Sequence, residues 1–190
     1  MQNAAVRENL YANLVRWGHS RKVQIILQIL FLIGIGTATA LVKKTQPSLG
    51  IPGSSAPLWL GTMVAGRALV RRDGGGALMG ATVAVMGIPI GLNNSFMHNL
   101  SLYGLTGLAL DLIARIPKIS IQNPLGAIIC GASAHMVKFG FITAAAYTSA
   151  VTKHFLVVGL AQSAGLHLVF GAAAGLIGWG AYKLTRIRRM

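Results

Sequence analysis

Acidic residues are the scarcest chemical class in this sequence, with three Asp and Glu together against 17 Lys and Arg in 190 residues. Charged residues make up only 11% of the chain, whereas soluble domains usually have about a quarter of their residues charged. The chain is also 54% hydrophobic. This composition excludes a soluble globular domain and predicts an all-α, polytopic membrane protein.

Cysteine and the motifs of catalysis are nearly absent as well. Cys130 stands alone in an apolar run, so it cannot form an intrachain disulfide, and we interpret it as a small packing residue. The histidines are scattered, and no H-x-x-x-H or C-x-x-C pair occurs, which predicts no metal site. Because paired carboxylates, a G-x-S-x-G motif and a Walker lysine loop are also missing, we expect neither enzymatic activity nor a cofactor.

The apolar segments that remain predict a bundle of six transmembrane helices. A spanning helix needs roughly 20 mainly apolar residues, and fewer where the protein thins the bilayer. We expect helices over residues 23–42, 57–70, 76–92, 96–116, 124–150 and 155–184. These form one transmembrane domain, residues 23–185, between a basic cytoplasmic tail, residues 186–190, and a basic segment, residues 1–22. That first segment is either a short amphipathic helix on the membrane surface or a frayed tail.

The basic residues predict the orientation of this bundle. If both termini lie in the cytoplasm, twelve basic residues fall on the cytoplasmic side: Arg7, Arg16, Arg21, Lys22, Arg71, Arg72, Arg115, Lys118, Lys183, Arg186, Arg188 and Arg189. Three fall outside: Lys43, Lys44 and Lys153. This bias is typical of multi-pass proteins in a prokaryotic plasma membrane. Because the charges flank apolar segments and form no single patch, we do not expect nucleic-acid binding.

Polar residues gather in the half of the bundle that this topology places toward the outside. We predict that they line a cavity for a ligand, since polar groups near hydrocarbon are costly unless they have partners. The candidates are Asn93, Asn94, His98, Asn99, His135, Lys138, Tyr147, Gln162 and His167. The alternatives are that residues 93–99 form a hydrated loop and that each histidine is an interior residue with satisfied hydrogen bonds.

Lys138 lies near the middle of its predicted helix, where a charge costs roughly 2.5 to 3.5 kcal/mol. Asp111 is expected some 15 Å away in depth, and the other acids, Glu8 and Asp73, are expected in the cytoplasm. Either Lys138 is neutral or bonded to free carbonyls, or it meets an acceptor-rich or anionic part of a ligand. Arg67 and Asp111 are expected at matching depth, where they could form an ion pair that we interpret as structural first and functional second. The alternative is that the Arg67 side chain extends to the membrane interface.

Small residues at four-residue spacing predict close contacts between helices. One such run, residues 34–40, holds Gly34, Gly36, Ala38 and Ala40, and a second run contains Gly76-x-x-x-Gly80. The sequence leaves open whether the first run packs on its own bundle or on a partner chain. The Pro-, Gly- and Ser-rich stretch over residues 45–56 is either a lid over a site or a plain connector.

Six short, glycine-rich helices with a long first external loop and no ATPase motif resemble the S components of energy-coupling-factor (ECF) vitamin transporters. The resemblance covers roughly residues 20–185. Within it, PLWLGTMVAGRALVRRDGGGALMGATVAVMG and LYGLTGLALDLIARI are similar to the branch associated with hydroxymethylpyrimidine and thiamine precursors.

This resemblance implies a non-enzymatic subunit that binds a water-soluble vitamin or vitamin precursor near the outer surface. Trp59 and the loop over residues 45–56 would be possible lid elements. The pocket would use Asn93, Asn94, His98, Asn99, His135, Lys138, Tyr147 and Gln162. The partner would be a transmembrane coupling subunit carrying two ATPase subunits, in contact with small-residue faces such as residues 34–40. The whole S component would topple in the bilayer to deliver its ligand inward.

Two other classes stay open. One is a non-catalytic membrane assembly or scaffold subunit, in which Lys138 pairs with a partner chain. The other, an intramembrane enzyme, is the weakest, because no nucleophile, base and orienting group converge in the sequence.

Overall fold

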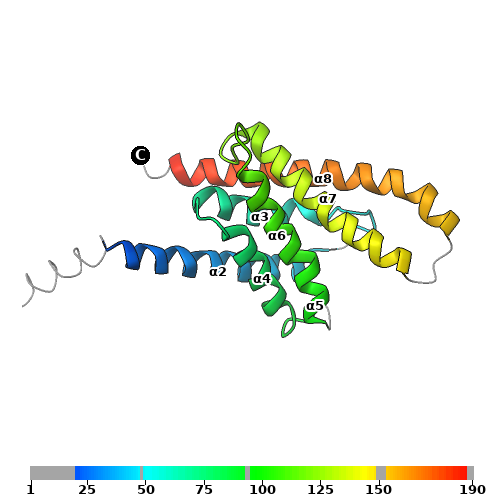
Figure 1. The fold of residues 1–190 in the computed structure, drawn as a ribbon, viewed down its shortest axis with the longest axis horizontal. Coiled ribbons are helices and arrows are strands. Elements are labelled where there is room, and N and C mark those ends of the chain that lie inside the picture. The colour runs from blue at the N-terminus through cyan, green and yellow to red at the C-terminus, as the bar shows by residue number, and fades with distance from the viewer. Residues whose placement is uncertain (1–19, 48, 93–94, 149–152, 188–190) are drawn as a thin grey trace, which may run out of the picture. The chain divides into compact units, whose positions relative to one another are not determined.

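The computed structural model describes residues 20–47, 49–92, 95–148 and 153–187, and the regular elements among them are all helices (Figure 1). They are α2 (Arg21–Thr45), α3 (Ala56–Leu69), α4 (Gly75–Gly87), α5 (Phe96–Asn99), η1 (Leu100–Gly104), α6 (Leu105–Ala114), α7 (Pro124–Thr148) and α8 (Lys153–Ile187). The chain divides into two compact units within α2. Residues 21–31 of α2 belong to the first unit, and the second unit, Leu32–Met190, holds the rest of α2 and all later helices.

The predicted all-α fold is confirmed. Because α5, η1 and α6 are continuous, the described residues form six helical segments, as expected. Three stretches, Arg21–Thr45, Pro124–Tyr147 and Gly159–Thr185, are long and apolar enough to cross a membrane. The 14 and 13 residues of α3 and α4 give only about 20 Å of helix, less than the ~30 Å of a typical hydrocarbon core. Six complete spans and the orientation of the termini therefore stay predictions.

The predicted helix over residues 76–92 is too long at its end. α4 stops at Gly87, and the chain then closes in a glycine-terminated turn. Gly91 adopts a φ of 69°, the Gly91 N–H donates to Ile88 O at 3.0 Å, and the Leu92 N–H donates to Gly87 O at 2.8 Å. This pair of bonds satisfies the last helical carbonyls, and a left-handed glycine stops the helix there.

The predicted helix over residues 96–116 contains a feature that periodicity did not indicate, the π-helical turn η1. The segment begins at Ser95, whose hydroxyl accepts a hydrogen bond from the His98 N–H at 3.3 Å. In η1 the backbone of Tyr103 lies directly against α4, because a Cβ added to Gly80 would collide with the Tyr103 carbonyl. The close-packing role expected of Gly80 is confirmed.

Glycine also sets the contacts between α4 and α6 and between α7 and α8. α4 meets α6 where Gly76 and Gly107 each lie against the other's carbonyl oxygen, so that neither position has room for a Cβ. α7 and α8 run side by side (Figure 1) and make the same kind of contact between Gly131 and Gly171. Small residues at these positions let two helix backbones approach closely, which strengthens dispersion contacts along the whole interface.

The predicted ion pair between Arg67 and Asp111 is confirmed and joins three helices. Arg67 Nε on α3 is 2.7 Å from Asp111 Oδ1 on α6, and both side chains are buried. The same carboxylate accepts the backbone N–H groups of Gly76 at 3.0 Å and Ala77 at 2.9 Å. Asp111 thus neutralises a buried cation and also caps the first turn of α4, where a negative charge is favoured.

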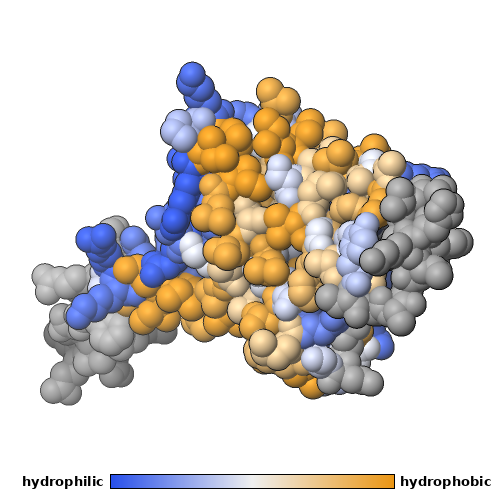
Figure 2. Space-filling view, turned by 45° about the vertical axis from the view of Figure 1, so that its right-hand side comes forward, coloured by the Kyte–Doolittle hydropathy of each residue, from blue (hydrophilic) through white to orange (hydrophobic). Residues whose placement is uncertain are grey.

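The core of the second unit lies between α3 and its neighbours and includes the fully buried Trp59, Leu60 and Met63. The outer surface is unusually apolar: Figure 2 shows hydrophobic side chains spread over most of one face. Large apolar side chains such as Leu125 and Val169 are exposed. An apolar exterior around a packed interior fits a protein surrounded by lipid.

Candidate ligand cavity

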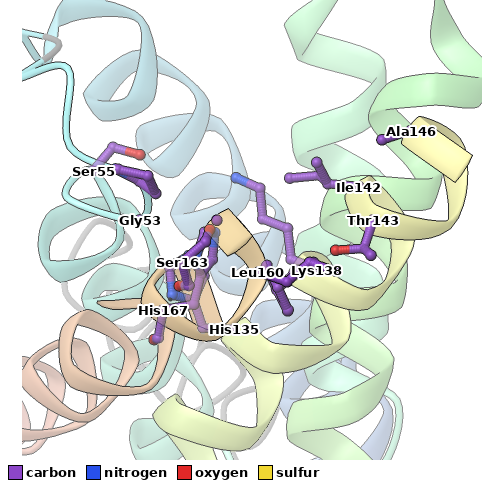
Figure 3. A pocket seen from close by; sticks show the side chains of 13 residues that line it. Gly53, Ser55, His135, Lys138, Ile142, Thr143, Ala146, Leu160, Ser163 and His167 are labelled. Atoms are coloured by element: carbon purple, nitrogen blue, oxygen red, sulfur yellow. Dashed lines mark hydrogen bonds between the residues drawn. The ribbon is translucent and has the colours of Figure 1, made fainter. Parts of the chain in front are cut away.

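A cavity of about 470 Å³ lies between the loop that precedes α3 and the facing sides of α7 and α8 (Figure 3). The loop supplies Pro52, Gly53 and Ser55. The helices supply His135, Lys138, Phe139, Ile142, Thr143, Ala146, Gly159, Leu160, Ser163 and His167. Cavities of this size hold small organic ligands, and the mostly apolar wall with a few polar groups is the usual composition of such sites.

Lys138 is the only lysine or arginine among the residues that line this cavity. Its side chain is 8% exposed, and Figure 3 shows it projecting from α7 into the space between Ser55 and Ile142. The ammonium Nζ lies 4.5 Å from the Trp59 ring centroid and 5.2 Å from the Tyr103 ring centroid. Neither of the salt bridges found among the described residues involves Lys138. Aromatic faces therefore hold this cation in place of a carboxylate.

The Trp59 ring lies beneath the Lys138 ammonium group. It is fully buried and meets Tyr103 edge to face, with ring centroids 5.3 Å apart. Its indole Nε1 has no hydrogen-bond partner among the described residues. Burying such a donor without a partner costs about 1–3 kcal/mol, so the buried position of Trp59 lowers the stability of the fold by that amount.

Two histidines form the wall next to Lys138, with their rings tilted by 32° and their centroids 4.6 Å apart. His135 Nδ1 is 2.9 Å from His167 O, and His167 Nδ1 is 2.8 Å from Ser163 O. A carbonyl oxygen can only accept, so Nδ1 is the donor in both rings. In the neutral form of each ring, Nε2 is then left as a hydrogen-bond acceptor.

A second cation lies one hydrogen bond from the cavity. Lys43, near the end of α2, donates through Nζ to the Ser55 hydroxyl at 2.9 Å. Ser55 itself lines the cavity. The Ser55 hydroxyl is therefore polarised by a lysine, and the polar groups of this site comprise two ammonium groups, two imidazoles and several hydroxyls.

The structure brings together some of the predicted site residues and separates others. His135, Lys138 and His167 line the cavity as a group, and Trp59 lies directly behind Lys138. The remaining described candidates do not line it: His98, whose ring faces Phe141 at 6.0 Å, the buried Asn99, the half-exposed Tyr147 and the exposed Gln162. Asn93 and Asn94 lie outside the described residues.

Three hydroxyl residues of the cavity, Ser55, Thr143 and Ser163, are not among the residues that the sequence predicts. Ser163 lies four residues before His167, so it shares a helix face with that histidine, and this spacing is a usable signal. Ser55 belongs to the loop over residues 45–56, for which the sequence leaves a lid or a plain connector open. Three residues of that loop contribute to the cavity wall.

The small residues of α2 face two directions. Gly36 and Ala40 are buried in the bundle, and a Cβ at Gly36 would lie 2.6 Å from Thr82 Cβ. Gly34 and Ala38 are exposed, and Gly34 has open space around its Cβ position. A partner chain can therefore contact Gly34 and Ala38 directly, while Gly36 and Ala40 serve internal packing.

No protein-family model, curated protein or solved structure matches the chain. Among the described residues, no group of three or more His, Cys, Asp or Glu side chains is arranged to hold a metal ion. The site's own chemistry is therefore the basis for a functional proposal.

Proposed function

We propose that this chain is a membrane-embedded substrate-binding subunit for uptake of a water-soluble vitamin or vitamin precursor. It captures the solute at the extracytoplasmic side and delivers it inward together with a transmembrane coupling subunit and two ATPase subunits. The observation that carries the proposal is Lys138, a buried cation without an acidic partner among the described residues, which points into a ligand-sized cavity.

The charges around the cavity support an anionic or acceptor-rich solute. Lys138 and the Ser55 hydroxyl, polarised by Lys43, are hydrogen-bond donors, and the two histidines add acceptors in their neutral forms. A ligand oxygen that accepts from Lys138 gains a charge-assisted bond in a partly desolvated site.

The placement of charge supports the orientation. The cavity lies near the start of α3, and the arginine-rich hairpin over residues 71–75 follows the end of α3. The positive-inside bias puts the arginine end in the cytoplasm, so the cavity opens outward, as a capture site requires. With six spans, the short α3 and α4 cross a locally thinned bilayer, and both termini lie in the cytoplasm of a prokaryotic cell.

The test is a ligand screen with the full chain purified in detergent. Native mass spectrometry searches for a retained small molecule, and a thermal-shift screen of vitamins and their precursors follows. A ligand that binds the folded state raises the unfolding temperature, because it adds about 2.7 kcal/mol of stability at a hundred-fold excess over Kd.

Two matched variants locate the ligand. Lys138→Met removes the cavity cation, and Lys44→Met removes a neighbouring lysine that donates to Gly91 O and does not line the cavity. We expect Lys138→Met to lose about ten-fold or more in affinity, the effect of one charge-assisted hydrogen bond, with Lys44→Met unchanged. Unchanged affinity in a folded Lys138→Met protein refutes the role of Lys138. A stoichiometric protein partner with no stabilising ligand supports the scaffold class instead.

A further inference from the structure

A second cavity, of about 290 Å³, lies at the far end of α3 from Lys138. Its charged lining residues are Arg67, Arg71, Asp73 and Arg115, and Ala114 and residues 119–122 complete its wall. We call it the arginine cavity. Ser55 and Arg67 are twelve positions apart, about 18 Å along a helix, so the two cavities are separate sites.

The three arginines differ in how they are paired. Arg67 is buried and committed to Asp111. Arg115 Nε lies 3.5 Å from Asp73 Oδ1, but these side chains are 56% and 73% exposed, so water weakens their attraction. Arg71 is exposed and takes part in no salt bridge among the described residues. The unpaired Arg71 and the weakly paired Arg115 are therefore the two guanidinium groups of this cavity that can meet an external anion.

We propose that the arginine cavity binds a phosphate-bearing group, supplied either by an anionic phospholipid headgroup or by a free phosphate compound. A guanidinium presents two parallel N–H donors that match two phosphate oxygens, which an ammonium cannot do. The volume is roughly ten times the ~30 Å³ share of a water molecule, so a phosphate group fits with part of its headgroup.

The surface beside the arginine cavity favours the lipid source. Leu112 and Ile116, on either side of Arg115 in the sequence, are about half exposed. They provide an apolar surface for acyl chains next to a cationic pocket for the headgroup. Only one acid, Asp73, lies in the lining to oppose an anion. Each basic residue at a membrane surface contributes about 1 kcal/mol to the binding of anionic lipid. Two arginines therefore correspond to about a thirty-fold higher affinity for an anionic lipid than for a zwitterionic one.

The experiment compares lipid retention by the delipidated full chain in native mass spectrometry. Phosphatidylglycerol is the anionic probe, and phosphatidylcholine is the zwitterionic one. Two double variants each remove two positive charges from the same end of the molecule. Arg71→Gln with Arg115→Gln removes the unpaired and the weakly paired guanidinium group from the cavity, while Arg72→Gln with Lys118→Gln changes residues that do not line it.

We expect the wild type to retain phosphatidylglycerol at least about ten-fold better than phosphatidylcholine. The Arg72/Lys118 variant should show the same preference. The Arg71/Arg115 variant should lose this preference. Absence of a preference in the wild type overturns the proposal, as does an equal loss in both double variants, which would mean diffuse surface charge. If the Arg71/Arg115 variant does not fold, Arg71→Lys tests the same point, because it keeps the charge and removes the forked donor.

Inorganic phosphate distinguishes the two sources. Displacement of phosphatidylglycerol by millimolar inorganic phosphate, with a thermal shift from phosphate alone, assigns the cavity to free phosphate compounds. Retention of the lipid under the same conditions assigns it to the headgroup. Lys138→Met should leave lipid retention unchanged, since the two cavities share no lining residue. This proposal therefore stands or falls separately from the proposed uptake function.

Discussion

Replacement of Asp111 by Asn tests the ion pair at the junction of α3, α4 and α6. The carboxylate receives Arg67 Nε at 2.7 Å, Gly76 N at 3.0 Å and Ala77 N at 2.9 Å. An amide has one acceptor oxygen and a donor NH₂ group, so at least one of these three donors loses its partner. Arg67, which is 5% exposed, also loses its counter-charge. Breaking a buried pair in this way costs about 3–5 kcal/mol, and we expect that loss in the free energy of unfolding.

The measurement is reversible unfolding in mixed micelles, with Asp73→Asn as the matched control. Asp73 makes the same kind of contact with Arg115, but on the surface, so its loss should cost about 0–1 kcal/mol. Adding Arg67→Met to Asp111→Asn should restore part of the stability, because no unpaired buried charge then remains. If Asp111→Asn is no more destabilising than Asp73→Asn, the junction is not held by this carboxylate.

Two further predictions concern the helix contacts. Gly107→Ala should destabilise the fold by about 1–3 kcal/mol, since its methyl group would collide with Gly76 O. Gly34→Ala should leave the unfolding free energy unchanged or raise it by up to about 1 kcal/mol, since its Cβ position is open and alanine favours the helix. Equal destabilisation by the two variants would contradict the backbone contact. Ala38→Leu should leave folding and ligand binding intact but reduce cellular uptake if α2 meets the coupling subunit, whereas Gly36→Leu should disturb packing on Thr82. Normal uptake by Ala38→Leu would exclude that docking face.

The helices of this chain could be predicted from sequence because their apolar segments are separated by strong turn residues. The predicted span over residues 57–70 differs by one residue at each end from α3. The predicted helices differ from the structure where the local backbone geometry departs from the regular helix that the apolar composition predicts. Residues 88–92 are apolar enough to continue α4, but Gly91 in the left-handed conformation ends the helix. The π-helical turn η1 leaves no trace in the hydrophobic pattern, because it changes the backbone and not the residue types.

The candidate site was predictable only in part, for a physical reason. Lys138 and His135 stand out because a titratable residue in an apolar helix is costly, and this cost is visible in the sequence. The ion pair between Arg67 and Asp111 followed from matching depth alone. Hydroxyl residues such as Ser55 and Thr143 carry no such cost, so only the tertiary structure shows that they face the cavity. Conversely, Tyr147 and Gln162 share the depth of the site but not its face.

The scarcity of acids links the two ends of the molecule. The two acids in the described residues, Asp73 and Asp111, each contact an arginine that lines the arginine cavity. Neither contacts Lys138 or Lys43 among the described residues, and those lysines therefore meet aromatic faces and a hydroxyl. An anion that neutralises the cavity at Lys138 must then come from outside these helices. If the ligand is anionic, its affinity should fall as the salt concentration rises, because salt screens its attraction to the lysines. The affinity of a neutral ligand should stay constant. The salt dependence of affinity thus distinguishes an anionic ligand from a neutral one even before the chemical structure of that ligand is determined.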